Sequence, residues 1–384
     1  MTASSTKEAA ASPLPRSAEK STKRGHLARL EPAEARERGL TARTIFGAVL
    51  LSLVLCLGGC FGPQSQSPYE TLSSEAHTEL EKLHQDRQRF DLAELWNAYV
   101  TFLEAHRHHV PTHRQFQDEM IEAGLRDRVR ETYRVWLTEA ETDSDFYHSL
   151  FLTMFARLVD DDREAIRVLE RAVDVDDDNH WAWYGIGFLQ HRQQVRRLAI
   201  RAYDEAIAIR PDWPLPYIQA AELEMERERF EAAASYYAGY LRLVPDDPDT
   251  LYNYARLLHL RLDRRAEAGE IYRRLITDNP GSLGLERLID VFNNLAHLET
   301  IDRDYTTAEA LYQRILQIDS SWLEANLNLA ILYEDYLEDP RKALANYRTF
   351  LELGGPRRFP DLTNEFFVIN AIDRLEKRLK GVPK

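Results

Sequence analysis

The stretch "HWAWYGIGFLQHRQQVRRLAIRAYDEAIAIRP", His180 to Pro211, decides the fold of this 384-residue chain. Ala199, Tyr203 and Ala206 follow one another at i, i+4 and i+7, so they fall on one face of a helix. Gly187, twelve residues before Ala199, is small enough to let a preceding helix approach that face closely. Pro211 cannot continue the second helix. The stretch therefore predicts two short helices packed against each other.

The same spacing recurs along the chain. A second copy ends at Pro245, 34 residues after Pro211, and later copies end at Pro280 and Gly355 with one extra residue between their helices. A divergent copy with a long first helix lies between these two. The positions on the second helices that match Ala199, Tyr203 and Ala206 are Leu95, Tyr99 and Phe102; Ala165, Leu169 and Ala172; Ala233, Tyr237 and Tyr240; Ala268, Tyr272 and Leu275; Ala308, Tyr312 and Ile315; and Ala343, Tyr347 and Phe350.

This pattern resembles the tetratricopeptide repeat, whose period of 34 residues carries Trp, Leu-Gly, Ala, an aromatic residue and Pro at these intervals. The resemblance implies an all-α, tetratricopeptide-type α-solenoid, a right-handed superhelix of about eight helix pairs. We expect degenerate helix pairs over residues 74–142 and the regular array over 143–355. A capping helix is expected within 356–384, with Asp361 as its N-cap.

Charge and cysteine content narrow the possible partners. The chain carries a net charge of −14, but residues 1–59 hold nine Lys and Arg against five Asp and Glu, so the remainder carries −18. An acidic body disfavours nucleic acid as a partner, because a phosphate-binding surface needs positive charge. The only two cysteines are Cys56 and Cys60, which excludes a disulfide framework or a cysteine metal site in the body.

The amino-terminal segment has the layout of an export signal. Residues 1–43 show no sustained apolar stripe and should be disordered or precede the true start, and 44–59 form an uncharged stretch with the length of a signal-peptide core. Its end, Leu57, Gly58 and Gly59 before Cys60, resembles the lipobox of bacterial lipoproteins. The resemblance implies that Cys60 becomes the acylated first residue of the mature protein.

An alternative remains open for this segment. An uncleaved signal anchor with a 43-residue cytoplasmic tail would also fit, and the long charged stretch before the apolar run favours it. Phe61 follows the cysteine in place of Asp, which in well-studied lipoprotein sorting implies the periplasmic face of the outer membrane; the inner membrane with a periplasmic repeat domain is the alternative. Residues 60–73 are predicted to be a flexible tether.

No motif in the sequence indicates catalysis. We find no phosphate-binding loop, nucleophile elbow or zinc-protease motif, and we expect no enzyme activity, cofactor, metal or small-molecule substrate. His109 and His113 have metal-ligand spacing, but Pro111 lies between them, so surface histidines at a helix end are expected. The acidic run 174–180 lacks the Gly and distal Glu of a calcium loop and is expected to be a solvated turn.

A peptide-binding groove is the remaining candidate site. In the tetratricopeptide family the first helix of each pair lines a concave groove, and mixed aromatic and amide side chains suit a peptide. The Lys and Asn set with which some members bind a carboxy-terminal carboxylate is missing here. Mapping the groove face onto this sequence gives Trp181, Tyr184, Phe188, Ile218, Gln219, Glu222, Tyr252, Asn253 and Arg256, with Leu327, Asn328 and Ile331 in the last copy. Packing between repeats is the alternative role of each aromatic residue.

Together these observations favour a non-enzymatic, membrane-anchored scaffold that binds partner proteins in the bacterial envelope. Support for assembly of a secretin, type IV pilus or motility complex ranks first by architecture. An outer-membrane protein assembly factor and a signal-anchored adaptor are the alternatives, and a cryptic metal-dependent enzyme ranks below them.

Overall fold

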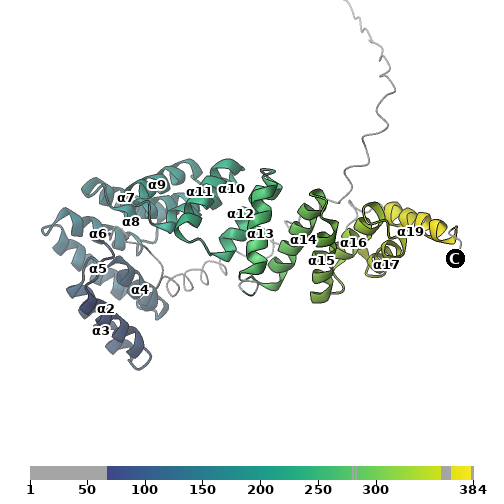
Figure 1. Ribbon diagram of the computed structural model, residues 1–384. Coiled ribbons are helices and arrows are strands. Elements are labelled where there is room, and N and C mark those ends of the chain that lie inside the picture. Colours follow the sequence, from purple (N-terminus) through teal and green to yellow (C-terminus); the bar gives the residue numbers. More distant parts are fainter. Residues whose placement is uncertain (1–66, 279–280, 282, 356–364, 382–384) are drawn as a thin grey trace, which may run out of the picture. The chain divides into compact units, whose positions relative to one another are not determined.

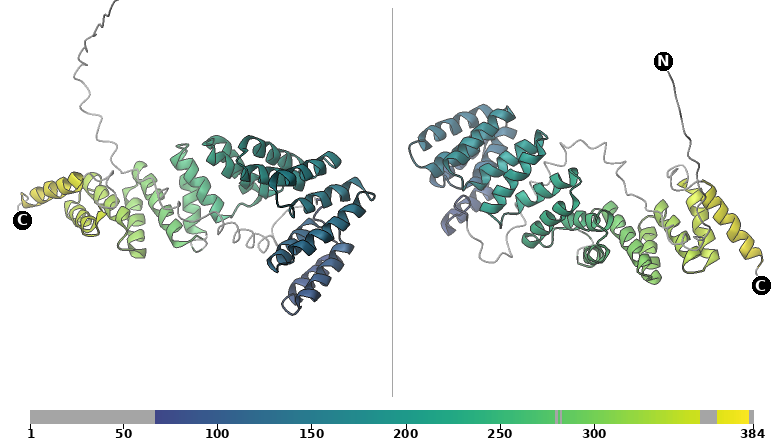
Figure 2. Two further views of the ribbon diagram at one scale, coloured as in Figure 1. Left: turned by 180° about the vertical axis from the view of Figure 1, so that it is seen from behind. Right: turned by 90° about the horizontal axis from the view of Figure 1, so that it is seen from above.

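The computed structural model describes residues 67–278, 281, 283–355 and 365–381. These residues fall into two compact units, one ending at Ile271 and one beginning at Tyr272. Every regular element in the described part is a helix (Figures 1 and 2). The helices are α2 (Ser74–Asp86), α3 (Leu92–Ala105), α4 (Val110–Glu122), α5 (Arg126–Ala140), α6 (Asp145–Ala156), α7 (Asp162–Val175), α8 (His180–Arg192), α9 (Arg196–Ile209), α10 (Pro214–Glu226), α11 (Phe230–Leu243), α12 (Pro248–Leu260), α13 (Arg265–Thr277), α14 (Leu285–Ile301), α15 (Tyr305–Ile318), α16 (Leu323–Asp335), α17 (Pro340–Glu352) and α19 (Glu365–Lys380).

Helices α2 to α17 follow one another as eight helix pairs, so the predicted all-α repeat fold is confirmed. A three- or four-residue turn joins the two helices of most pairs. In six of the eight pairs one residue of that turn has a positive φ: Gly124, Gln194, Glu228, Asp263, Arg303 and Glu338. Only the first of these is a glycine, so the turn was not recognisable from sequence.

Close approach of the two helices within a pair depends on glycine residues, which have no side chain. A Cβ on Gly187 of α8 would lie 2.7 Å from ring atoms of Tyr203 on α9. A Cβ on Gly239 of α11 would lie 2.6 Å from the ring of Tyr217 on α10. Both distances are below van der Waals contact, so each glycine makes room for an aromatic ring of the partner helix.

A buried tyrosine recurs at one position of the second helix. This position is fully buried in six pairs and 4% exposed in α11, while α7 carries Leu169 there. The tyrosines are Tyr99, Tyr133, Tyr203, Tyr237, Tyr272, Tyr312 and Tyr347. Tyr133 was not recognised from the sequence, although it follows Tyr99 by 34 residues and is the middle residue of the spacing Val129, Tyr133, Trp136.

The last pair is covered by α19, as the predicted capping helix requires. Val368, Ala371 and Leu375 of α19 are at most 1% exposed, and α19 packs on α17. Burying such aliphatic side chains stabilises by about 1.5–3 kcal/mol each for Val and Leu. Arg374 also donates to Glu334 of α16. The predicted N-cap, Asp361, lies outside the described residues.

In the unit that ends at Ile271, first helices pack on the first helices of neighbouring pairs. Contacts join α4 to α6, α6 to α8 and α8 to α10, and no comparable packing joins the described second helices of neighbouring pairs. First helices that lie closer together than second helices place α4, α6, α8 and α10 on the inside of the stack. We call their exposed surface the inner face, and we extend this name to the exposed surface of α12, the next first helix of this unit.

Candidate functional site

The inner face at α8 is aromatic. Trp181 is 7% exposed and its ring lies 4.5 Å from that of Trp213 and 6.4 Å from that of Tyr184. The guanidinium of Arg114 on α4 lies 4.8 Å from the Trp181 ring, a cation–π contact. Tyr184 and Phe188 are half-buried. Trp181 therefore serves mainly to pack successive pairs, while Tyr184 and Phe188 keep surface for a partner.

The predicted residues on α10 form a polar patch. Gln219 donates to Glu222 at 3.3 Å, and Ile218 beside them is half-buried. Glu222 is exposed, but the surrounding helices displace water and, with the nearby charge of Glu226, raise the pKa of the Glu222 carboxyl to about 7. This carboxyl is thus positioned to change charge near neutral pH.

The predicted residues on α12 combine a packed ring with half-buried polar groups. Tyr252 is 4% exposed and lies 5.4 Å from the Arg256 guanidinium. Asn253 and Arg256 are half-buried. The polar groups of α12, like those of α10, are therefore the parts of the prediction that remain available for contact.

In the last repeat, the residues predicted to line the groove are core residues of α16. Leu327 and Ile331 of α16 are each 2% exposed, and Asn328 is 4% exposed and donates to Asn293 of α14. These three side chains pack within their own unit and present no surface for a peptide. The register of the mapped face was therefore wrong for α16, a helix whose buried residues run almost unbroken from Leu323 to Tyr333.

The histidine cluster corrects another expectation. His109 and His113 are 7% and 0% exposed, so they are not surface residues. Pro111 lies in the first turn of α4 and starts this helix after His109. The ring of His113 bonds the Tyr133 hydroxyl at 2.7 Å and the Arg107 carbonyl at 2.9 Å. His113 is thus a hydrogen-bonded core residue.

Burial keeps both of these histidines neutral. It lowers the pKa of His109 to about 4 and of His113 to about 3. Among the described residues, no group of three or more His, Cys, Asp or Glu side chains is arranged to hold a metal ion.

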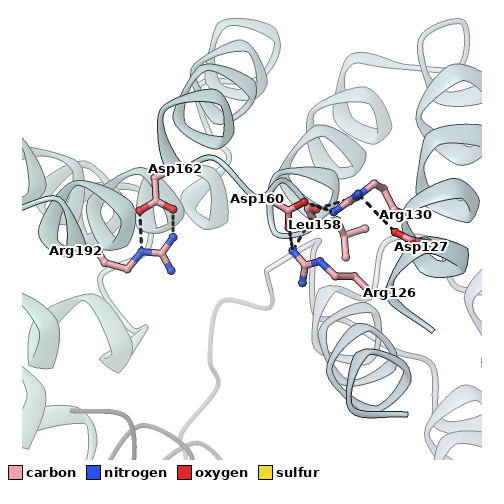
Figure 3. A network of polar contacts seen from close by, with 7 residues as sticks. All are labelled: Arg126, Asp127, Arg130, Leu158, Asp160, Asp162 and Arg192. Carbon is pink, nitrogen blue, oxygen red and sulfur yellow. Dashed lines mark hydrogen bonds and ion pairs between the residues drawn. The ribbon is translucent and has the colours of Figure 1, made fainter. Parts of the chain in front are cut away.

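The acidic segments are helix starts and turns. The run 174–180 contains the turn between α7 and α8, with Asn179 as the N-cap of α8, and Asp161 caps α7. Figure 3 shows the ion pairs that the aspartates beside this second cap make: Asp160 with Arg126 and Arg130 of α5, and Asp162 with Arg192 of α8. These ion pairs link neighbouring helix pairs.

A segment that precedes the first helix was missed. Residues 67–72, which we call the strap, were predicted to belong to the flexible tether, yet Ser67 and Tyr69 are 7% and 2% exposed. The Tyr69 hydroxyl donates to Asp176 at 2.5 Å, and the Glu70 carboxylate pairs with Arg210. The tether therefore ends earlier than predicted. A lone aromatic–acidic pair carries no periodicity, so no sequence pattern could have placed it.

The predicted anchor falls outside the described residues, which begin at 67. This applies to residues 1–43, 44–59, the lipobox residues Leu57, Gly58 and Gly59, and Cys60. Among the helices of the described part, none has both the length and the apolar character needed to cross a bilayer.

Comparison with known proteins agrees with the helix pairs. Residues 218–282 match the family model described as "Tetratricopeptide repeat". Within the described residues, the helix pairs and buried tyrosines on both sides of this match repeat the same arrangement, so the fold is of the tetratricopeptide type. No curated protein matches the sequence.

Several solved structures are similar to this chain. One is YrrB, described as a tetratricopeptide repeat protein with an unusual peptide-binding site, at 15% identity over 48% of this chain and 91% of that one, with a TM-score of 0.41. Another is PilF of Pseudomonas aeruginosa, at 18% identity over 64% and 98%, with a TM-score of 0.38. A third is the type IV pilus biogenesis factor PilW, at 18% identity over 53% and 93%, with a TM-score of 0.37.

Proposed function

We propose that this protein is a membrane-anchored scaffold whose inner face binds segments of partner proteins in a bacterial envelope. The observation that carries the proposal is the set of side chains on three successive first helices. Tyr184, Gln219 and Asn253 are half-buried on α8, α10 and α12, so each is held in place and still presents surface. Aromatic and amide groups on a rigid helical face suit peptide recognition.

The anchor is a separate part of the proposal. Acylation of Cys60 would hold the helical array at the periplasmic face of the outer membrane, because several acyl chains together give stable attachment. Attached there, the array would support assembly of a secretin, type IV pilus or motility complex. Lipid anchor and binding face together motivate that role.

Photo-crosslinking in the native cell tests the binding face. A benzophenone amino acid replaces Tyr184 or Asn253, with Glu205 on the second helix α9 as the matched position away from the inner face. We expect the same protein to be captured from both inner-face positions and not from Glu205. Equal capture from all three positions, or capture from none, would contradict the proposed face.

Metabolic labelling tests the anchor independently. The wild-type chain should incorporate radiolabelled palmitate, and Cys60→Ser should lose both the label and the membrane association, whereas Cys56→Ser should retain both. A Cys60→Ser chain that stays in the membrane without label would identify an uncleaved signal anchor.

A further inference from the structure

The strap lies along one end of three first helices, α4, α6 and α8. The backbone N–H of Val110, the first residue of α4, donates to the Tyr69 carbonyl at 2.9 Å. The Tyr69 ring stacks on Phe146 of α6 at 4.7 Å and meets His180, the first residue of α8, edge-on at 5.3 Å. Arg210, which binds Glu70, lies between α9 and α10. One short segment thus contacts three successive helix pairs, α4–α5, α6–α7 and α8–α9.

The side chains of Phe146, His180 and Asp176 surround Tyr69, and we call them the Tyr69 seat; the side chains that contact Glu70 are the Glu70 seat. The Tyr69 seat accommodates an aromatic ring that carries a polar group at its tip. Phe146 and His180 cover its ring, and the carboxylate of Asp176 accepts a hydrogen bond from its hydroxyl at 2.5 Å. Tyr69 is left 2% exposed. Such a seat favours tyrosine over phenylalanine, because phenylalanine would leave the Asp176 carboxylate without this donor.

The seat of Glu70 combines the guanidinium of Arg210 with the ring of His180. The Arg210 side chain is 12% exposed, and its guanidinium also lies 3.5 Å from the Asp212 carboxylate. His180 Nε2 lies 3.9 Å from the Glu70 carboxylate. Burial alone would raise the pKa of Glu70, but the nearby His180 ring and Arg210 guanidinium outweigh burial and lower this pKa to about 2.

Strap release would cost no helical hydrogen bond. The strap precedes α2, and its backbone contacts outside residues 67–72 are the bond from Val110 and that between the His108 ring and the Thr71 carbonyl at 2.7 Å. The Tyr69 and Glu70 seats are formed by the repeats themselves. An incoming segment could therefore occupy both seats while every helix stays folded.

We propose that these two seats form a recognition site for a partner segment that makes the same turn as residues 67–70 and in which a tyrosine is followed by an acidic residue, and that the strap is its occupant in cis. The proposal rests on the proposed binding function and adds the partner's chemistry. A partner must compete with a segment of the same chain, whose effective concentration is high. Only a partner segment that fits both seats can therefore displace the strap.

Binding of a synthetic strap peptide tests the proposal. The probe is fluorescein-labelled SPYETLSS, the sequence of residues 67–74, titrated by anisotropy against the full chain in detergent. Tyr69→Ala/Glu70→Ala, which empties both seats, should bind the probe saturably, and the wild type should bind it about 100-fold more weakly. A peptide with alanine at the tyrosine and glutamate positions should bind neither chain. Adding Arg210→Gln to the emptied variant should abolish the preference for the glutamate.

Several results would overturn the proposal. One is a Tyr69→Ala/Glu70→Ala variant that keeps its helical circular dichroism but does not bind the probe. Another is a variant that binds the alanine peptide as tightly as the strap peptide. A wild type that does not bind the probe at any concentration would also overturn it, because the strap would then never leave the two seats. If the double variant does not fold, Glu70→Gln should still bind the probe more tightly than wild type, and equal binding would refute the site. Crosslinking from α8 and α12 does not involve these seats, so it can succeed or fail independently.

Discussion

The pair α4–α5 and the pair α10–α11 build one backbone arrangement from different chemistry. The core of α4–α5 is made of large rings and a buried histidine, including Phe116, Tyr133, Trp136 and His113. The core of α10–α11 is rich in alanine, with Ala220, Ala221, Ala233 and Ala234 at most 3% exposed, and Gly239 in contact with an aromatic ring. The same fold can therefore be packed with large rings that carry polar groups or with small residues that let the helices approach closely.

The difference shows which property each pair depends on. In α4–α5 the rings must satisfy the polar atoms that they bury, because an unpaired buried group is costly. In α10–α11 the ring of Tyr217 lies against Gly239 and Tyr237 packs among alanines, so the volume available between the helices is the limiting quantity. We therefore expect the first pair to respond to protonation and hydrogen-bond loss, and the second to added atoms.

Acid should have the largest effect, and its sign should differ between the two pairs. His109 and His113 have native pKa values of about 4 and 3, below the ordinary 6.5. Between pH 6.5 and 4 the unfolded chain binds more protons, so α4–α5 loses stability as the pH falls, by up to about 1.4 kcal/mol per pH unit for each histidine. This contribution is fully present above pH 6.5.

Glu222 of α10 should act in the opposite direction. Its native pKa of about 7 lies above the ordinary 4.5, so between these values the native state binds the extra proton and α10–α11 gains stability as the pH falls. Equilibration at pH 7, 6 and 5 in moderate urea, followed by a hydrogen-exchange pulse at one common pH, measures both pairs. Parallel loss of protection in α4–α5 and α10–α11 would contradict the assignment, and Glu222→Gln should remove the gain.

Gly239→Ala should cost the next largest amount. The added methyl would lie 2.6 Å from the Tyr217 ring, and overpacking of this kind destabilises by about 1–3 kcal/mol. Gly284→Ala is a control without a steric clash, since a Cβ there meets nothing within 4 Å; because Gly284 is the N-cap of α14, the change should still cost up to about 1 kcal/mol. Urea denaturation followed by circular dichroism compares them. Equal midpoints would refute the close-packing account.

Sequence patterns predicted the fold better than the site, for a physical reason. The spacing of Ala199, Tyr203 and Pro211 reports helix periodicity and termination, which act locally and repeat in every copy. Exposure of Trp181 or Leu327 depends on how one pair packs on the next. Periodicity assigns a residue to a helix face, but it does not say whether a neighbouring ring such as Trp213 covers that face.

The strap and the histidines show a second limit. Tyr69 reaches Asp176, and Glu70 reaches Arg210, across more than a hundred residues, so no local rule links them. His113 was expected at the surface because its spacing from His109 was considered without its distant partner, Tyr133. A buried polar side chain is predictable only once the group that satisfies it is known.

Tyr133→Phe should cost more than the same change at Tyr203. The Arg107 carbonyl can only accept, so His113 Nε2 donates to it, and Nδ1 of this neutral ring accepts from the Tyr133 hydroxyl. Removing the hydroxyl leaves a buried acceptor unpaired, at a cost of about 1–3 kcal/mol. The Tyr203 hydroxyl is buried without a hydrogen-bond partner, so Tyr203→Phe should be neutral or stabilising. Urea midpoints that rank in the reverse order would contradict this network.

The smallest effect concerns the turn inside each pair. Gly124 has φ +81° between α4 and α5, and Gln194 has φ +63° at the matching place between α8 and α9. A Cβ on Gly124 would meet nothing within 4 Å, so Gly124→Ala should cost about 1 kcal/mol through backbone conformation alone. Gln194→Gly relieves the same strain but gives the unfolded chain more freedom, and the two effects should nearly cancel. A Gln194→Gly chain that loses as much stability as Gly124→Ala would show that the glutamine side chain, and not the turn, stabilises α8–α9.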